Sequence, residues 1–421
     1  MKRETCKSAS LAIVAVLSGM LLWSSPHKPL VLLPLLATLL ACLVVPIPGR
    51  SRHVIGLGLL LIAVPAAGFQ NSFLFELGIQ IGIYAALALG LNVVVGLAGL
   101  LDLGYAAFFA IGAYTWAIFG SPQANAFIAG GGFPLPGWPY FYLFAALAVV
   151  TAALTGVLIG LPALRLRGDY LAIVTLGLGE VVRVLANNLD HPVNFTNGPQ
   201  GISPVERPPI GLLEKALHAC GIDVSPPVAY ALFFYLLVLA VVGIVTLVNI
   251  RLDRSRYGRS WIAIREDEIA ARSMGISLVR TKILAFATGA AFSGVMGAIF
   301  AAKQLFVSPE SFTLLQSITI LAMVILGGMG SIKGAVVGAA AVTLLNIEVL
   351  KNLSDFLNDL RQAGFTLTLG AWHYDFSQLP TQLEPAKYER MIFGLIIVLM
   401  MIFRPSGLIP ESRHKLELEE E

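Results

Sequence analysis

The sequence predicts an all-α protein, a polytopic transmembrane helical bundle of ten to twelve spans. Hydrophobic residues fill 57% of the 421 positions and charged residues only 13%, about half the charged share of a soluble domain. Apolar stretches approaching the roughly 20 residues of a membrane span recur along the whole chain. No Asp, Glu, Lys or Arg occurs in the 62 positions from Leu103 to Leu164, and a soluble core helix does not explain such a run.

The individual spans follow from these stretches in chain order. The strong ones cover residues 8–23, 30–47, 54–69, 77–101, 103–120, 139–161, 228–250, 283–302, 313–331 and 335–347. Weaker ones cover 170–188 and 391–403. Two stretches meet at Asp102, and 77–101 and 103–120 are either two separate crossings or a pair that is broken or re-entrant around Asp102. The first stretch also fits a secretory signal peptide, because Lys2, Arg3 and Lys7 precede it, although Ser24–His27 lacks the usual small-residue cleavage pattern.

The lysines and arginines predict the orientation. If the N-terminus is cytoplasmic and each stretch crosses once, 19 of the 28 basic residues fall on the cytoplasmic side and eight outside. This excess matches the positive-inside rule, so we expect both termini in the cytoplasm. Turn-rich outer loops are then expected over 189–227 and 351–388. Three regions are predicted, namely an N-terminal extension with two or three extra spans (1–72), a permease core (73–410) and an acidic cytoplasmic tail (411–421).

Composition and motifs also exclude several functions. The formal charge of +3 is too small for nucleic-acid binding. The three cysteines form no C-x-x-C pair, and the six histidines show no zinc-ligand spacing. No Gly-Lys dipeptide occurs, which excludes a Walker A loop. We therefore predict no catalytic residue, no cofactor and no metal in this chain.

The most informative hydrophilic segment is residues 251–282. It holds eight basic and four acidic residues between two strong spans. Within it, Ser260 is expected to cap a short amphipathic cytoplasmic helix and Gly275 to end it. A plain solvated loop, anchored only by the positive-inside rule, is the alternative.

Residues 270–275 have the pattern A-A-x-x-x-G after an acidic run. This pattern resembles the cytoplasmic "EAA" loop of bacterial ABC importer permeases, although Ile269 separates Glu268 from the two alanines. In that family the loop forms a coupling helix that docks in a cleft of the ATPase subunit. The resemblance implies the ATPase-coupling positions Trp261, Ile264, Glu268, Ala270, Ala271 and Gly275.

The resemblance extends over residues 75–410. Segments 91–114, 164–170 with 175–177, 196–202 and 325–331 are similar to the signatures of branched-chain amino-acid permeases of the LivM type. That family implies a bacterial inner-membrane importer with a second homologous permease subunit, two cytoplasmic ATP-binding subunits and a periplasmic binding protein that delivers Leu, Ile or Val. Relatives with similar motifs are thought to serve urea, amides or other amino acids, so another small solute stays an alternative.

Three polar positions in or between spans are candidates for pore or helix-break residues: Asn92, Asp102 and Glu180. Glu180 and Arg183 are three residues apart, which favours an ion pair within one helix. Asp102 either caps a half-helix or faces the substrate path, and Asn92 is expected to bridge two helices.

The glycines predict close helix contacts and one tight turn. Gly78/Gly82, Gly156/Gly160 and Gly334/Gly338 are G-x-x-x-G pairs, and Gly289, Ser293 and Gly297 form a ladder of small residues. Packing is the favoured interpretation, and sliding of helices during transport is the alternative. The glycine-rich run 327–334 follows a span and predicts a turn rather than a nucleotide-binding loop.

Two other functional classes are alternatives to an ABC permease. An ion-driven secondary transporter would need paired charged or unwound sites in both halves of the chain, and the charge-free run argues against it. An intramembrane enzyme would need a nucleophile with a base in reach. Residues 291–294 only approach an intramembrane-protease pattern, and no histidine lies in a strong span.

Overall fold

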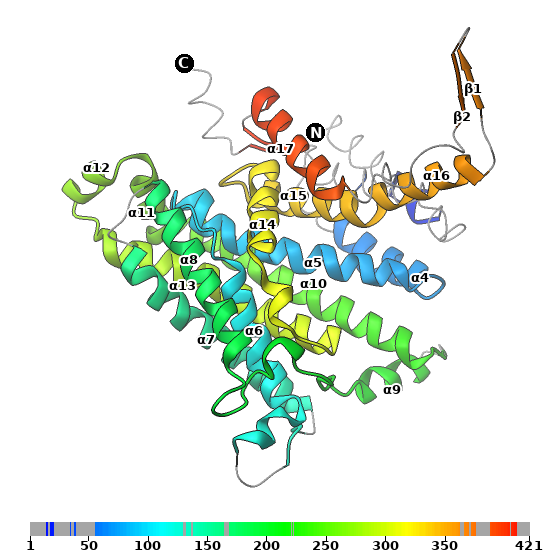
Figure 1. Ribbon diagram of the computed structural model, residues 1–421, viewed down its shortest axis with the longest axis horizontal. Coiled ribbons are helices and arrows are strands. Elements are labelled where there is room, and N and C mark those ends of the chain that lie inside the picture. Colours follow the sequence, from blue (N-terminus) through cyan, green and yellow to red (C-terminus); the bar gives the residue numbers. More distant parts are fainter. Residues whose placement is uncertain are drawn as a thin grey trace, which may run out of the picture. The chain divides into compact units, whose positions relative to one another are not determined.

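The computed structural model is helical, with one short β-hairpin (Figure 1). It describes residues 14–15, 17–20, 34, 38, 55–128, 132–135, 138–163, 168–219, 221, 223–362, 366–369, 372–375, 388–404 and 406–410. Most of the predicted stretches 8–23 and 30–47, the signal-peptide alternative and the tail 411–421 lie outside these residues. The chain divides into two compact units, one of residues 1–81 with 340–405 and one of residues 82–339 with 406–421.

Six helical segments in the described part of the chain are long and apolar enough to cross a membrane. They are Phe73–Leu97, Pro139–Pro162, Pro226–Asp253, Leu278–Gln304, Pro309–Gly327 and Ile332–Asp355. Three shorter apolar helices are Ile55–Gly68, Ala106–Phe119 and Gly394–Phe403. The predicted stretch 170–188 forms a helix of 20 residues that carries Asp169, Glu180 and Arg183, and it is not among the six.

The unit of residues 1–81 and 340–405 is the smaller of the two. In chain order its elements are η2 (Leu59–Ala63), α4 (Val64–Gly68), the start of α5 (Phe73–Leu91), the end of α15 (Ile332–Leu344), η7 (Leu345–Val349), α16 (Leu350–Gln362), β1 (Thr366–Leu369), β2 (Trp372–Asp375) and α17 (Glu389–Phe403). The antiparallel hairpin pairs Thr366 with Asp375 and Leu369 with Trp372. The sequence predicted an all-α fold with a loop at 351–388, and the hairpin lies in this segment. Alternating β-branched, aromatic and apolar residues explain it, because they favour strands.

The unit of residues 82–339 and 406–421 holds the predicted coupling segment 251–282. Its helices are α6 (Ala106–Phe119), α7 (Trp138–Ala163), α8 (Asp169–Asn188), α9 (Gly211–Ala219), α10 (Pro226–Asp253), α11 (Arg256–Glu266), α12 (Glu268–Ser273), α13 (Leu278–Gln304) and α14 (Leu314–Gly327). Short helical turns are η3 (Asn92–Leu97), η4 (Pro122–Ala126), η5 (Gly198–Gln200) and η6 (Pro309–Phe312).

Helix α13 is the centre of this unit, where it packs against α6 and α7 (Figure 1). Glycines allow the backbones to touch. A Cβ atom on Gly112 of α6 would collide with the carbonyl oxygen of Gly294 in α13. Two other glycines of α13 also lie close to neighbouring backbone. A Cβ on Gly289 would lie 3.0 Å from the carbonyl oxygen of Gly90, and a Cβ on Gly297 would lie 2.6 Å from the Ala113 nitrogen. The packing interpretation of the ladder is therefore confirmed at its two glycines.

The helix is interrupted between α5 and α6, so of the two possibilities at Asp102 the structure has the break. Helix α5 widens into the π-helical turn η3, residues 98–105 are not helical, and α6 begins at Ala106. Because α6 has 14 residues, it is about 21 Å long, shorter than the roughly 30 Å hydrocarbon core. Helix α6 is therefore too short to cross the membrane, and the stretch 103–120 is not a full span.

The predicted turn after α14 is confirmed. Gly328 and Gly330 have φ values of 118° and 82°, a region that glycine enters without a steric penalty. Helix α15 begins at Ile332, directly after this turn.

Candidate functional site

The predicted coupling segment contains two short helices rather than one. Helix α11 begins after Ser255, whose hydroxyl accepts a hydrogen bond from the Gly258 N–H at 3.2 Å. The expectation that Ser260 caps the helix is wrong, since Ser260 lies inside α11 and donates to the Arg256 carbonyl at 2.9 Å. Gly258 explains the early start, because a Cβ there would lie 2.6 Å from the Asp253 carbonyl oxygen in the tight corner after α10.

Asp267 separates the two helices. Its backbone is extended, and its Oδ1 accepts hydrogen bonds from the N–H groups of Ile269 (2.7 Å) and Ala270 (3.0 Å). This is an N-cap, which satisfies donors that the start of α12 leaves without a helical partner. Gly275, with φ of 82°, follows the end of α12, so the predicted stop at this glycine is confirmed.

Two of the predicted coupling residues point into the protein. Trp261 is fully buried in a cluster with Val94, Leu97 and Phe286, and its Nε1 donates to the Thr281 carbonyl at 2.7 Å. Ile264 is 3% exposed. These residues anchor α11 on η3 and α13.

The acidic and small residues of α12 divide between the interior and the surface. Glu268 forms an ion pair with the buried ammonium of Lys282. Ala271 is buried, whereas Ala270 and Gly275 are exposed. A bulky residue at Ala271 would therefore disturb the packing of the segment before it affected a partner.

The exposed apolar surface of the segment comes from residues that the motif does not contain. Ile269 is 68% exposed and Met274 is 83% exposed. In the sequence, Ile269 only interrupts the motif, and no local signal separates it from the buried Ile264. Burial distinguishes them, since Ile264 faces the bundle and Ile269 faces outward.

Arg265 connects the coupling segment to the break in the helical core. Its Nη1 donates to the Gly96 carbonyl in η3 at 2.8 Å, and its stem lies against Gly99, where a Cβ would be 2.6 Å from the Arg265 Cγ. The same guanidinium binds Glu266 at 3.0 Å. Arg265 thus joins α11 directly to the π-helical turn.

We expect Arg265→Ala to lower the free energy of unfolding by about 1.5–3 kcal/mol, because a hydrogen bond from a charged group to the Gly96 carbonyl is lost. Arg259→Ala is the matched control, since Arg259 is exposed on the same helix. Thermal unfolding of the two variants in detergent compares them. Equal stability of the two variants would contradict a role of Arg265 in holding α11 on η3.

Asn92 and Asp102 hold the backbone around the break. Asn92 Oδ1 accepts a hydrogen bond from the Gly330 N–H at 2.8 Å, so it bridges η3 to the turn between α14 and α15. Asp102 Oδ1 accepts from the Gly104 N–H at 2.9 Å, two residues before α6 begins. The expectation that Asn92 bridges two helices is refined, because its partner is the turn rather than a helix.

Side chains of other helices complete the start of α6. The hydroxyl of Thr175 in α8 accepts from the Leu103 N–H at 3.1 Å, and the hydroxyl of Ser317 in α14 accepts from the Ala106 N–H at 2.9 Å. The first helical N–H groups need such acceptors when they are away from water. The sequence predicted this role for neither hydroxyl, since helices far apart in the chain supply them.

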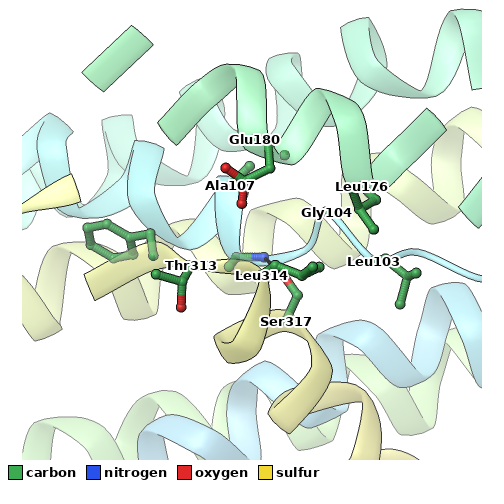
Figure 2. Close-up of a pocket in the computed structure, with 11 residues that line it drawn as sticks. Leu103, Gly104, Ala107, Leu176, Glu180, Thr313, Leu314 and Ser317 are labelled. Carbon is green, nitrogen blue, oxygen red and sulfur yellow. Dashed lines mark hydrogen bonds between the residues drawn. The ribbon is translucent and has the colours of Figure 1, made fainter. Parts of the chain in front are cut away.

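A pocket opens beside this helix start, and Figure 2 shows it. It lies between α6, α8, η6 and α14, and Glu180 lines it. Glu180 Oε2 accepts from Arg183 Nε at 2.7 Å, which confirms the predicted pair, and Arg183 also binds Glu310 at 3.3 Å. Asn92 and Asp102 do not line the pocket, so the structure places only one of the three polar candidates there.

Within the described ranges, no group of three His, Cys, Asp or Glu side chains lies close enough to hold a metal ion.

Comparisons with known proteins identify the family of this chain. Residues 73–401 match the family described as branched-chain amino acid transport system, permease component. The high-affinity branched-chain amino acid transport system permease protein LivM of Escherichia coli is 42% identical over 347 residues, covering 80% of this chain and 70% of the relative. Its namesake from Salmonella typhimurium is 40% identical over 373 residues, covering 86% and 76%.

A more distant relative, the probable branched-chain amino acid transport permease protein LivM of Methanocaldococcus jannaschii, is 25% identical, covering 79% of this chain and 91% of the relative. No solved structure matches the chain. The family match spans most of the sequence, from α5 to α17. The chain therefore belongs to the family of permease components of branched-chain amino acid transport systems.

Proposed function

We propose that this chain is the membrane permease subunit of an ATP-driven importer and forms part of the path for leucine, isoleucine and valine. One observation carries the proposal. Ile269 of α12 and Met274, directly after α12, are exposed in the most arginine-rich segment of the chain, while Trp261 and Arg265 attach that segment to the core. Exposed apolar side chains on an anchored, charged segment fit a docking surface for a partner protein.

The partners follow from this surface and from the family. Two cytoplasmic ATP-binding subunits would bind the coupling segments, one on this chain and one on a second, homologous permease subunit. A periplasmic binding protein would deliver the cargo, and the permease pair would stand in the lipid bilayer of the bacterial inner membrane. This chain itself carries no catalysis, because the ATP-binding subunits hydrolyse ATP.

We propose ten to twelve crossings with both termini in the cytoplasm, which adds the first 72 residues as an extension to the permease core of residues 73–410. The distribution of 19 basic residues inside and eight outside supports this orientation. The residues beyond 410 would be a solvated cytoplasmic tail.

The cargo is tested by uptake in a strain that lacks this chain and carries it on a plasmid. We expect labelled leucine to enter only with the plasmid, and we expect excess valine to compete while urea and a short amide do not. Competition by urea or the amide alone would assign the chain to another small solute. Uptake that an uncoupler abolishes and ATP depletion spares would favour the ion-driven alternative.

A further inference from the structure

The pocket at the start of α6 has a polar side and an apolar side. Its eleven lining residues are Leu103, Gly104, Ala106, Ala107, Leu176, Gly179, Glu180, Phe312, Thr313, Leu314 and Ser317. The polar side chains are one carboxylate and two hydroxyls, and no lining side chain is cationic. Figure 2 shows the Glu180 carboxylate pointing from α8 toward Ala107 at the start of α6.

The ion pair of Glu180 leaves this carboxylate able to bind a further donor. Arg183 engages Oε2, and Oε1 accepts no hydrogen bond from any described residue. The Glu180 side chain is 35% exposed, so a ligand has access to it. Arg183 also shares its charge with Glu310, which leaves one net negative charge on these three side chains.

The start of α6 does not offer free donors to an anion. The N–H groups of Ala106, Ala107 and Phe108 are bound to the Ser317 hydroxyl and to the carbonyls of Gly104 and Tyr105. A ligand carboxylate placed here would face Glu180 without an available N–H at these positions. A ligand group with several N–H donors and a positive charge would instead find Glu180 Oε1 and the two hydroxyls as acceptors.

The volume of the pocket and its apolar wall limit the size and the chemistry of the ligand. The unfilled space amounts to about 200 Å³ with its open mouth, below the roughly 300 Å³ at which pockets for drug-sized ligands begin. Its enclosed part holds a group the size of a water molecule, such as an ammonium group. Beside it, Leu103, Leu176 and Leu314 supply an aliphatic wall.

We infer that this pocket is a transient binding site for the primary ammonium group of an aliphatic α-amino acid, with Glu180 as its acceptor and the leucine wall against its side chain. The inference rests on the proposed function, which supplies an amino acid as cargo. The site would act during passage through the permease, because the ammonium loses water on leaving the aqueous phase and Glu180 replaces part of that hydration.

The test compares Glu180→Gln with Glu310→Gln in the complete importer reconstituted in vesicles. Both changes remove one carboxylate from Arg183, but only Glu180 lines the pocket. Because a charged hydrogen bond is lost, we expect leucine uptake by Glu180→Gln to fall about tenfold. Uptake by Glu310→Gln should stay near wild type, because Glu310 does not line the pocket.

The possible results test the binding site and the proposed function separately. If Glu180→Gln takes up leucine at the wild-type rate, the proposed binding site is wrong and the proposed function is unaffected. An equal loss in both variants would assign Glu180 to holding Arg183 and would also overturn the site. A wild-type complex that takes up no leucine would overturn both.

A binding measurement avoids dependence on transport and on the folding of Glu180→Gln. Thr313→Cys places a thiol in the pocket, and Leu315→Cys places one on an exposed residue of the same helix start that does not line the pocket. We expect leucine, but not 4-methyl-2-oxopentanoate, which lacks the ammonium group, to slow alkylation of Cys at 313. Equal protection by both compounds, or none by leucine, would overturn the inference.

Discussion

Ile269→Asp is expected to weaken binding of the proposed ATP-binding subunits at least about thirtyfold while leaving the permease folded. Ile269 is the second residue of α12 and is 68% exposed. Truncating an apolar anchor at the centre of an interface costs about 2 kcal/mol or more, which is a roughly thirtyfold or larger loss of affinity. An aspartate there would also have to be desolvated on docking.

The substitution separates binding from folding because of its position. A negative charge in the first turn of a helix interacts favourably with the helix dipole, so α12 itself is not weakened. Exposed substitutions change stability by only about 0.5 kcal/mol. Ile269→Leu, which keeps the apolar surface, is the control.

The measurement is co-purification of the ATP-binding subunits on a tagged permease, followed by titration of the separated components. Undiminished association of Ile269→Asp would show that α12 is not the docking element.

Gly294→Val is expected to prevent accumulation of folded permease. Gly294 lies in α13 where it crosses α7, and a Cβ there would lie 2.5 Å from the Cβ of Ala152 and would collide with the carbonyl oxygen of Ala148. Overpacking typically costs about 1–3 kcal/mol. The loss of stability should lie at or above the upper end of this range, because the Ala148 carbonyl belongs to the backbone and cannot rotate away. In addition, α6 approaches Gly294 from another side at Gly112.

Gly177→Ala is the matched control, because a Cβ at Gly177 in α8 meets nothing within 4 Å. Alanine is favoured over glycine in a helix by about 1 kcal/mol, so this variant should match or slightly exceed the wild type. Size-exclusion profiles and thermal unfolding in detergent compare the two. A monodisperse Gly294→Val protein with wild-type unfolding would contradict the close crossing of α7 and α13.

Features that depend on neighbours in sequence were predictable. The uninterrupted apolar runs predict helices such as α7 and α13. The turn at Gly328–Gly330 and the stop at Gly275 were predicted because glycine tolerates a positive φ. The pair of Glu180 and Arg183 follows from a spacing of three residues on a helix.

Local chemistry left other features open. Ser255 and Ser260 are equally suited to cap a helix, and the tight corner at Gly258 decides for Ser255. The hairpin at 366–375 was missed because its short alternating strands are embedded in a segment rich in turn residues. The count of ten to twelve crossings partly concerns residues outside those described, and it stays a prediction.

By itself, the sequence determined an apolar, helical chain with one strongly charged segment, since hydrophobic run length and charge distribution are properties of the chain alone. Its motifs indicated the permease family. Only the tertiary structure decided that Trp261 and Ile264 face the core while Ile269 and Met274 face outward. It also decided that Glu180 meets Thr313 and Ser317 at one pocket. The physical reason is the same in both cases: which face of a helix is buried, and which distant helices share a cavity, depends on packing between segments far apart in the chain.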